Sequence, residues 1–147
     1  MHSFTTHRDE FDGHLPNTLP LRSVFNIVER ARSEQLGGPK ALQRLKQENN
    51  LVFFVISGDG FALVNDEDSN VPAQCSPGQE VLVEISGKVR RNGTFVDVLH
   101  TLYKDQGNRK PGKRLAQGKI SLIAYNEALG RPATGLDIPQ WFLDYIV

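Results

Sequence analysis

The sequence predicts an α+β domain in which two N-terminal helices precede a small antiparallel β-barrel or strongly bent sheet, with further helices at the C-terminus. Three observations predict this class: a helical repeat of apolar residues over 21–45, a β-branched and aromatic stretch from Leu51, and an Asn-Gly turn between alternating strands. A chain of 147 residues suffices for one domain. We expect that domain to span 21–147, with its β core at about 51–104, behind an extended arm over 1–20.

The first helix is predicted from apolar residues that recur at i, i+3, i+4 and i+7, namely Leu21, Val24, Phe25 and Val28. Gly37-Gly38 can end this helix, and Pro39 suits the first turn of a second, shorter one. The preceding 20 residues hold three of the four histidines but show no periodicity, and no cysteine or acidic cluster accompanies them. We therefore expect a mobile arm there and not a metal site.

The segment 80–104 predicts a β-hairpin. Asn92-Gly93 is the preferred pair for a two-residue turn, and a turn there places Arg90 opposite Phe95 and Ile85 opposite His100. One face then carries Val89, Val96, Val98 and His100 and is expected to be the core face. A slip by one residue would move Lys88 and Arg90 to the apolar side, so this register is the consistent one.

The β region is expected to begin with two strands, 51–57 and 61–64, joined by a turn at Gly58-Asp59-Gly60. The segment 120–129 fits a strand or a helix, and Gly130 and Pro132 just beyond it favour the helix. A last short helix is predicted from Pro139. The longest apolar run, 51–56, is too short to span a membrane, and the N-terminus lacks the order of a secretory signal, so we expect a cytoplasmic protein.

Positive charge is concentrated in one stretch of the chain. Residues 88–119 contain nine Lys and Arg against two Asp, a local charge of +7, although the whole chain carries 17 basic and 17 acidic residues. Such a local field is typical of proteins with an anionic partner, most often nucleic acid.

In residues 52–68, an aromatic segment is followed by a glycine turn and then by a Gly-Phe-small-aliphatic segment that ends in acidic residues. Residues 77–85 contain the pattern Gly-x-x-Val-x-Val. This arrangement resembles the cold-shock-type OB-fold over about 50 of the 147 residues. The resemblance implies a β-barrel that binds nucleic acid.

Single-stranded nucleic acid is held by stacking on aromatic rings and by a basic groove along the backbone. We therefore expect a non-catalytic protein that binds single-stranded DNA or RNA and needs no cofactor or metal. The residues expected to form its binding surface are Phe54, Phe61, Lys88, Arg90, Arg91, Phe95, Tyr103, Arg109, Lys110, Lys113 and Arg114.

Two other functions stay open. The basic surface could serve a phage- or plasmid-type interaction or inhibitor module that recognises an acidic protein. A metal-dependent nuclease could use acidic residues as magnesium ligands, namely Asp59, Asp66, Glu67 and Asp68. Because the sequence contains no P-loop, nucleophile elbow or paired metal-ligand motif, catalysis is the less favoured hypothesis.

Overall fold

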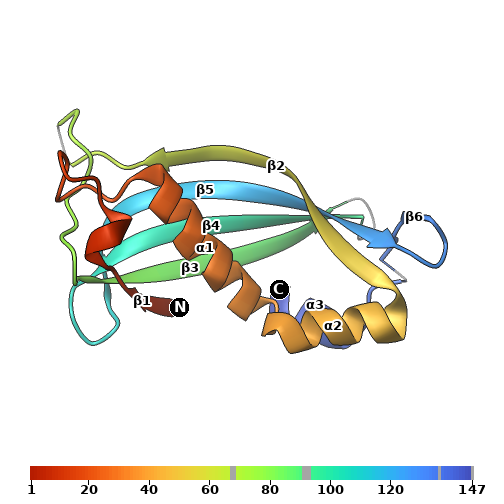
Figure 1. Cartoon of the computed structure of the whole chain (residues 1–147). Helices are drawn as coiled ribbons and strands as arrows, with labels where there is room; N and C mark the ends of the chain where they lie inside the picture. Colours follow the sequence, from red (N-terminus) through yellow and green to blue (C-terminus); the bar gives the residue numbers. More distant parts are fainter. Residues whose placement is uncertain (67–68, 91–93, 136, 147) are drawn as a thin grey trace. The chain divides into compact units, whose positions relative to one another are not determined.

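The computed structural model describes residues 1–66, 69–90, 94–135 and 137–146. Their elements in chain order are β1 (His2–Thr5), η1 (Arg8–Glu10), α1 (Leu21–Gln35), α2 (Gly38–Asn49), β2 (Leu51–Leu63), β3 (Glu80–Arg90), β4 (Phe95–Asp105), β5 (Pro111–Asn126), β6 (Arg131–Pro132) and α3 (Gln140–Ile146) (Figure 1). The strand order is β1-β3-β4-β5-β2, and β6 pairs with β5.

The predicted α+β class with an antiparallel sheet is confirmed, but the small closed barrel is not. In the described part of the chain, β1 and β2 stand at the two ends of the strand order, so the sheet has two edges. β2 runs without interruption through the Gly58-Asp59-Gly60 triplet, which was expected to be a turn between two strands. One long strand thus replaces the hairpin on which the OB-fold resemblance rested.

The chain divides into two compact units. Unit 1 comprises Met1–Ala31, Gly60–Ile85 and His100–Gly118, and unit 2 comprises Arg32–Asp59, Ser86–Leu99 and Lys119–Val147.

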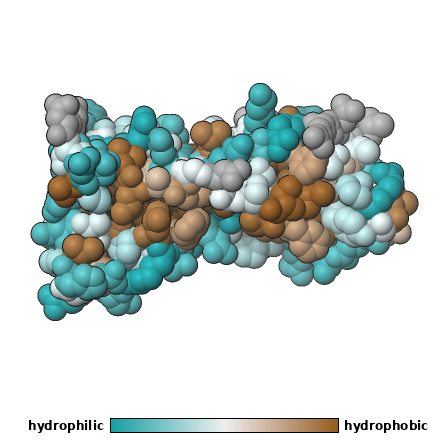
Figure 2. Space-filling view, turned by 90° about the horizontal axis from the view of Figure 1, so that it is seen from above, coloured by the Kyte–Doolittle hydropathy of each residue, from teal (hydrophilic) through white to brown (hydrophobic). Residues whose placement is uncertain are grey.

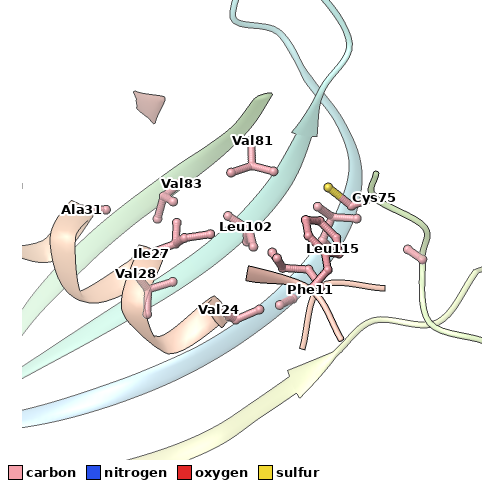
Figure 3. Packing of buried hydrophobic residues seen from close by; sticks show 13 residues of the cluster. Phe11, Val24, Ile27, Val28, Ala31, Cys75, Val81, Val83, Leu102 and Leu115 are labelled. Atoms are coloured by element: carbon pink, nitrogen blue, oxygen red, sulfur yellow. The ribbon is translucent and has the colours of Figure 1, made fainter. Parts of the chain in front are cut away.

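Unit 1 has its core where α1 covers the sheet. The buried face of α1 carries Val24, Ile27, Val28 and Ala31, as the helical repeat predicted. This face packs against strand and loop residues of the same unit, among them Val81, Val83, Leu102, Leu115 and Cys75 (Figure 3). Burial raises the pKa of the Cys75 thiol, which keeps the thiol neutral in this core.

The first residues of the chain, expected to be an arm, contain the strand β1 in unit 1. β1 pairs antiparallel with β3, with His2 opposite Val83 and Thr5 opposite Glu80. The hydroxyl of Thr6, which is buried, donates to the carbonyl oxygens of Ser76 and Gln79 at 3.1 and 2.8 Å. Because these partners lie 70 and 73 positions along the chain, no local pattern indicates the pairing.

Unit 2 contains α2, α3 and the first part of β2. Gly37 precedes α2 with φ +91°, and a Cβ there would lie 2.5 Å from the Cβ of Ala41, so this position requires glycine. The ring of Phe142 on α3 is fully buried and stacks on Phe53 of β2 at 5.2 Å. The helices predicted after Pro39 and after Pro139 are therefore confirmed.

The helix expected over 120–129 is wrong, because residues up to Asn126 belong to β5. β5 lies between β4 and β2 in the sheet. Ile120, Ser121, Leu122 and Ala124 are all buried on it, so both faces of the strand are covered. A strand covered on both faces loses its alternation and reads as a continuous apolar run, which sequence periodicity cannot separate from a buried helix.

The hairpin prediction is confirmed at the level of its strands, since β3 and β4 are neighbours in the sheet. Val96, Val98, His100 and Leu102, which the prediction placed on the core face, are all buried. The turn residues Asn92 and Gly93 lie outside the described residues.

Candidate functional site

The described residues form an open cleft of about 850 Å³ in unit 2, within the size range of ligand-binding clefts. It lies between the end of α1, the helix α2, and the strands β2 and β5. Its lining includes the apolar side chains of Leu36, Leu42, Leu45, Leu51, Val52, Phe53, Val55 and Leu122.

The cleft has a fixed floor and a polar rim. Leu45 and Leu51 are at most 1% exposed, and Phe53 is held by its stacking on Phe142. Hydrophilic residues also line the cleft, namely Arg32, Ser33, Gln43, Lys46, Gln47, Asn50 and Glu127. An apolar floor bordered by two cations and one carboxylate suits an elongated apolar group that is attached to a polar or anionic one.

A second candidate site is the polar segment that precedes α1 in unit 1. The backbone N–H of His7 donates to the Glu10 carboxylate at 2.8 Å, and the hydroxyl of Ser23 donates to the Glu10 carbonyl at 2.6 Å. The backbone N–H of Cys75 donates to the Asn17 carbonyl at 2.8 Å. These bonds fix the segment against α1 and the loop before β3.

Asp12 is the best-placed carboxylate of this segment. Its Oδ1 accepts from the Arg22 guanidinium at 3.0 Å, while its side chain remains 39% exposed. Gly13 and His14 follow it and are exposed. A carboxylate offers about four acceptor sites, so Asp12 can be oriented by Arg22 and still bind water.

Sequence reasoning missed Asp12 because it treated 1–20 as a mobile arm. The signal it overlooked is Glu10 three residues after His7, a capping-box spacing.

The predicted binding residues fall in both units. Phe54, Lys88, Arg90 and Phe95 belong to unit 2, and Phe61, Tyr103, Arg109, Lys110, Lys113 and Arg114 belong to unit 1. Arg91 lies outside the described residues.

Several of the predicted cations are already engaged within the chain. Lys113 pairs with Asp66 at 3.1 Å, and Arg109 donates to the Met1 carbonyl at 2.7 Å. Both contacts join residues distant in sequence, which a count of charges along the chain cannot show. The aromatic Phe61 is half-buried against Phe25 at 4.8 Å and His100 at 5.7 Å.

A polar network lies on β3, β4 and β5 in unit 2. The Arg90 guanidinium donates two hydrogen bonds to the Asp97 carboxylate, and the Ser121 hydroxyl donates a third at 2.7 Å. The Arg90 guanidinium lowers the pKa of the Asp97 carboxyl, and the hydrogen bond from Ser121 acts in the same direction. Arg90 also lies over the Phe95 ring at 5.1 Å, as expected for residues opposite each other.

The alternative of a metal-dependent nuclease gains no support here. Among the residues that the structure describes, no three His, Cys, Asp or Glu side chains are grouped so as to hold a metal ion. Glu67, Asp68 and the side chain of Asp59 lie outside the described residues.

His100 is fully buried beside Phe61, as predicted. No helix in the described part of the chain is long and apolar enough to cross a membrane.

Neither a family model nor a curated protein sequence matches the chain. Solved structures do. Slr0204, a 1,4-dihydroxy-2-naphthoyl-CoA thioesterase from Synechocystis, aligns with TM-score 0.73 and 11% identity over 99% of this chain and 93% of its own. YbaW, a probable thioesterase from Escherichia coli, aligns with the same score and identity over 99% and 97%. The dynemicin thioesterase aligns with TM-score 0.70 and 15% identity over 99% and 96%.

The chain has the fold of these thioesterases. The strand order β1-β3-β4-β5-β2 beside α1 is consistent with a hotdog-like fold and corrects the cold-shock OB-fold resemblance. The predicted function of nucleic-acid binding is wrong, as is the single-stranded nucleic-acid partner. A concentration of basic residues does not distinguish a nucleic-acid surface from cations that pair within the fold.

Proposed function

We propose that the protein is a thioesterase that hydrolyses acyl thioesters of the coenzyme A type. The observation that carries the proposal is an open apolar cleft in a chain that has the fold of thioesterases. The identities of 11–15% support the fold, and the activity is inferred from the chemistry of the described residues.

The cleft in unit 2 provides the site for the acyl group. Burial of each methylene is worth about 0.8 kcal/mol, so an apolar lining of leucine, valine and phenylalanine favours an acyl chain over a polar one. Arg32 and Lys46 at the same cleft favour a substrate that carries negative charge beside its apolar part. An acyl thioester of coenzyme A combines both properties, since its nucleotide portion is phosphorylated.

Asp12 is the candidate general base. Thioester hydrolysis needs a group that takes a proton from water as the water oxygen attacks the carbonyl carbon. The carbon–sulfur bond then breaks, the sulfur leaves and is protonated to a thiol, and the acyl group leaves as a carboxylic acid. Asp12 is exposed to water and held by Arg22, which is the arrangement that an oriented base requires.

The N-terminus of α1 offers positive partial charge that is complementary to the oxyanion formed during hydrolysis. Leu21 and Arg22 occupy its first turn, and backbone N–H groups at a helix N-terminus carry partial positive charge. Such donors stabilise the oxyanion that forms when water adds to the carbonyl. Asp12 and this helix terminus both belong to unit 1.

The purified chain is to be tested against coenzyme A thioesters of increasing acyl length, with release of free thiol as the readout. We expect hydrolysis above the buffer rate. Asp12→Asn should lower kcat by roughly 10²–10⁴-fold, the usual contribution of a general base. Asp9→Asn is the matched control, because Asp9 is an exposed carboxylate of the same segment, and it should keep the wild-type rate.

Absence of hydrolysis for every thioester tested would contradict the proposed activity. Hydrolysis that Asp12→Asn leaves intact would instead contradict only the role of Asp12. Leu42→Trp narrows the cleft and should lower the rate for long acyl chains more than for acetyl, since only a long chain reaches its lining.

A further inference from the structure

One face of the sheet in unit 2 is the feature that neither the core nor the cleft explains. The Asp97 carboxylate of β4 accepts hydrogen bonds from Arg90 of β3 and from Ser121 of β5. Phe54 of β2 lies against Tyr125 of β5, with the ring centres 6.3 Å apart. Ser121 and Tyr125 are four positions apart on one strand and so share a face. These contacts therefore run across a single face of β3, β4, β5 and β2, which we call the outer face of unit 2.

The cleft lies on the other side of the same strands. Successive residues of a strand point to opposite faces. Phe53 and Val55 line the cleft, whereas Phe54 and Ile56 alternate with them and belong to the outer face. On β5, Leu122 lines the cleft and directly follows a residue of the outer face. The two surfaces are thus distinct, and the outer face plays no part in the site proposed for the acyl group.

Large apolar side chains are exposed on the outer face. Phe54 is 54% exposed and Ile56 49%. Leu99 follows Asp97 by two residues on β4, which places it on the same face, and it is 51% exposed. Seen from above, the direction in which β2 lies at the top of Figure 1, hydrophobic residues form part of the surface (Figure 2). A group of exposed apolar side chains is typical of an interaction site.

The outer face also carries positive charge. Lys88 precedes Arg90 by two residues on β3, and Lys119 precedes Ser121 by two on β5, so both lysines belong to this face. After the Arg90 guanidinium, the charge of Lys119 also lowers the pKa of the Asp97 carboxyl, so this lysine lies near it. Asp97 itself is only 7% exposed and is neutralised by two hydrogen bonds from Arg90. The described members named here thus present apolar side chains beside cations.

This combination fits the surface of a bilayer that contains anionic lipids. Anionic headgroups attract Lys and Arg, and the boundary between headgroups and acyl chains takes up apolar side chains. Tyrosine is enriched at this boundary, and Tyr125 lies on the outer face beside Phe54. A second copy of the chain fits less well, because two such faces would bring lysines of like charge together.

We propose that the outer face of unit 2 docks the protein on membranes that contain anionic lipids. The exposed apolar side chains enter the headgroup region, and Lys88 and Lys119 bind the lipid headgroups. Arg90 covers the Asp97 carboxylate, which would otherwise repel anionic lipid. Docking of this kind uses a surface and needs no helix that crosses the bilayer. It does not rest on the proposed thioesterase activity, because its readout is binding to vesicles.

Co-sedimentation with vesicles tests the proposal. The full chain should bind vesicles of phosphatidylcholine with about one third phosphatidylserine, and bind phosphatidylcholine alone much more weakly. Binding to the mixed vesicles should fall as salt is raised. Lys88→Glu should lower it about fivefold or more, because a cation is replaced by an anion at an anionic surface. The double variant Phe54→Gln with Leu99→Gln should lower it roughly tenfold or more through the lost apolar contact.

Each variant has a matched control outside the outer face. Lys110→Glu makes the same charge change at an exposed lysine of unit 1, and Leu129→Gln removes an apolar side chain that is 56% exposed in unit 2. Both should bind the mixed vesicles as the wild type does. Absence of wild-type binding would overturn the proposal, as would a loss for Lys110→Glu equal to that for Lys88→Glu. If a second copy occupies the face instead, the double glutamine variant would have a lower molecular mass without vesicles, which would also overturn it.

A fluorophore that responds to solvent polarity tests the docking face even if the double glutamine variant fails to fold. Leu99→Cys and Leu129→Cys are labelled in separate samples, and Cys75 should stay unlabelled because it is 1% exposed. On addition of the mixed vesicles, the emission of the label at position 99 should shift to shorter wavelength, and that of the label at position 129 should shift much less. Equal shifts at the two positions would contradict docking through the outer face.

Discussion

In unit 1 the apolar face of α1 is closed over the sheet, whereas in unit 2 the space beside α2 stays open. Val24 and Ile27 of unit 1 are completely buried. In unit 2, Leu42 and Val55 line a cleft of about 850 Å³, and Val55 is more than half exposed. The same residue types therefore serve different ends. Those of unit 1 supply folding free energy, and those of unit 2 leave an apolar surface open to solvent.

The largest expected difference between the units concerns loss of a core side chain. Ile27→Ala should destabilise the fold by about 2–5 kcal/mol, because it leaves a cavity in a closed core. Leu42→Ala, at the cleft, should cost about 1 kcal/mol, since Leu42 is only half-buried. Urea unfolding of the two variants measures both values. Equal losses would mean that the cleft is packed as tightly as the core of unit 1.

Two strand glycines sharpen the same comparison. A Cβ on Gly118 in unit 1 would lie 2.3–2.5 Å from ring atoms of Phe61, so Gly118→Ala should destabilise by about 1–3 kcal/mol through overpacking. A Cβ on Gly58 in unit 2 would meet only the terminal Cδ1 of Ile120, at 3.2 Å. That methyl group can move, so Gly58→Ala should be near neutral or slightly stabilising. Thermal unfolding of both variants tests the contrast, and a larger loss for Gly58→Ala would reverse it.

Local patterns predicted the local elements of both units. The apolar repeat of α1, the Gly-Pro start of α2 and the strands on either side of Asn92-Gly93 depend on neighbouring residues, and the structure has them there. Non-local pairing accounts for what was missed. β1 is a strand because β3, some 80 positions away, pairs with it, and 120–126 is a strand because β4 and β2 flank it.

The candidate site was less accessible to prediction than the fold. The apolar repeat over 21–45 was recognised in the sequence, but such a repeat does not reveal whether the surface opposite it is closed or open. The charge pattern indicated an anionic ligand, yet the Lys113–Asp66 and Arg90–Asp97 pairs form only in the folded chain. The only signal near Asp12 was the capping-box spacing of His7 and Glu10, which indicates an ordered segment but not a functional carboxylate.

The polar network of unit 2 should give stability that depends on pH. The Arg90 guanidinium holds the pKa of the Asp97 carboxyl below its ordinary value, which is about 3.9. A carboxyl whose pKa is lowered on folding adds stability above its unfolded pKa and loses it as pH falls through the folded value. Asp97→Asn should therefore cost about 1 kcal/mol near neutral pH. The gap to wild type should narrow below about pH 4. Denaturant unfolding between neutral and acidic pH measures this, and parallel curves throughout would contradict it.

The smallest expected effects come from two arginines that lie over aromatic rings, one in each unit. Arg44 lies 4.1 Å from the centre of the Trp141 ring in unit 2, and Arg30 lies 4.8 Å from that of Phe4 in unit 1. Exposed contacts of this kind are worth about 0.5–1 kcal/mol, so Arg44→Ala and Arg30→Ala should each destabilise by about that amount. Trp141 is the only tryptophan, so its fluorescence reports on unit 2. Arg44→Ala should change that emission and Arg30→Ala should not.

Glu48→Gln is the control for Arg44, because it removes the exposed ion pair to Arg44 at 3.0 Å while the arginine stays over the ring. Its stability loss should be below about 0.5 kcal/mol, with tryptophan emission unchanged. If Glu48→Gln shifted the emission as much as Arg44→Ala, the ion pair and not the ring contact would position Arg44. If Arg30→Ala also shifted the tryptophan emission, the fluorescence of Trp141 would respond to changes in unit 1. The emission would then no longer report on unit 2 alone.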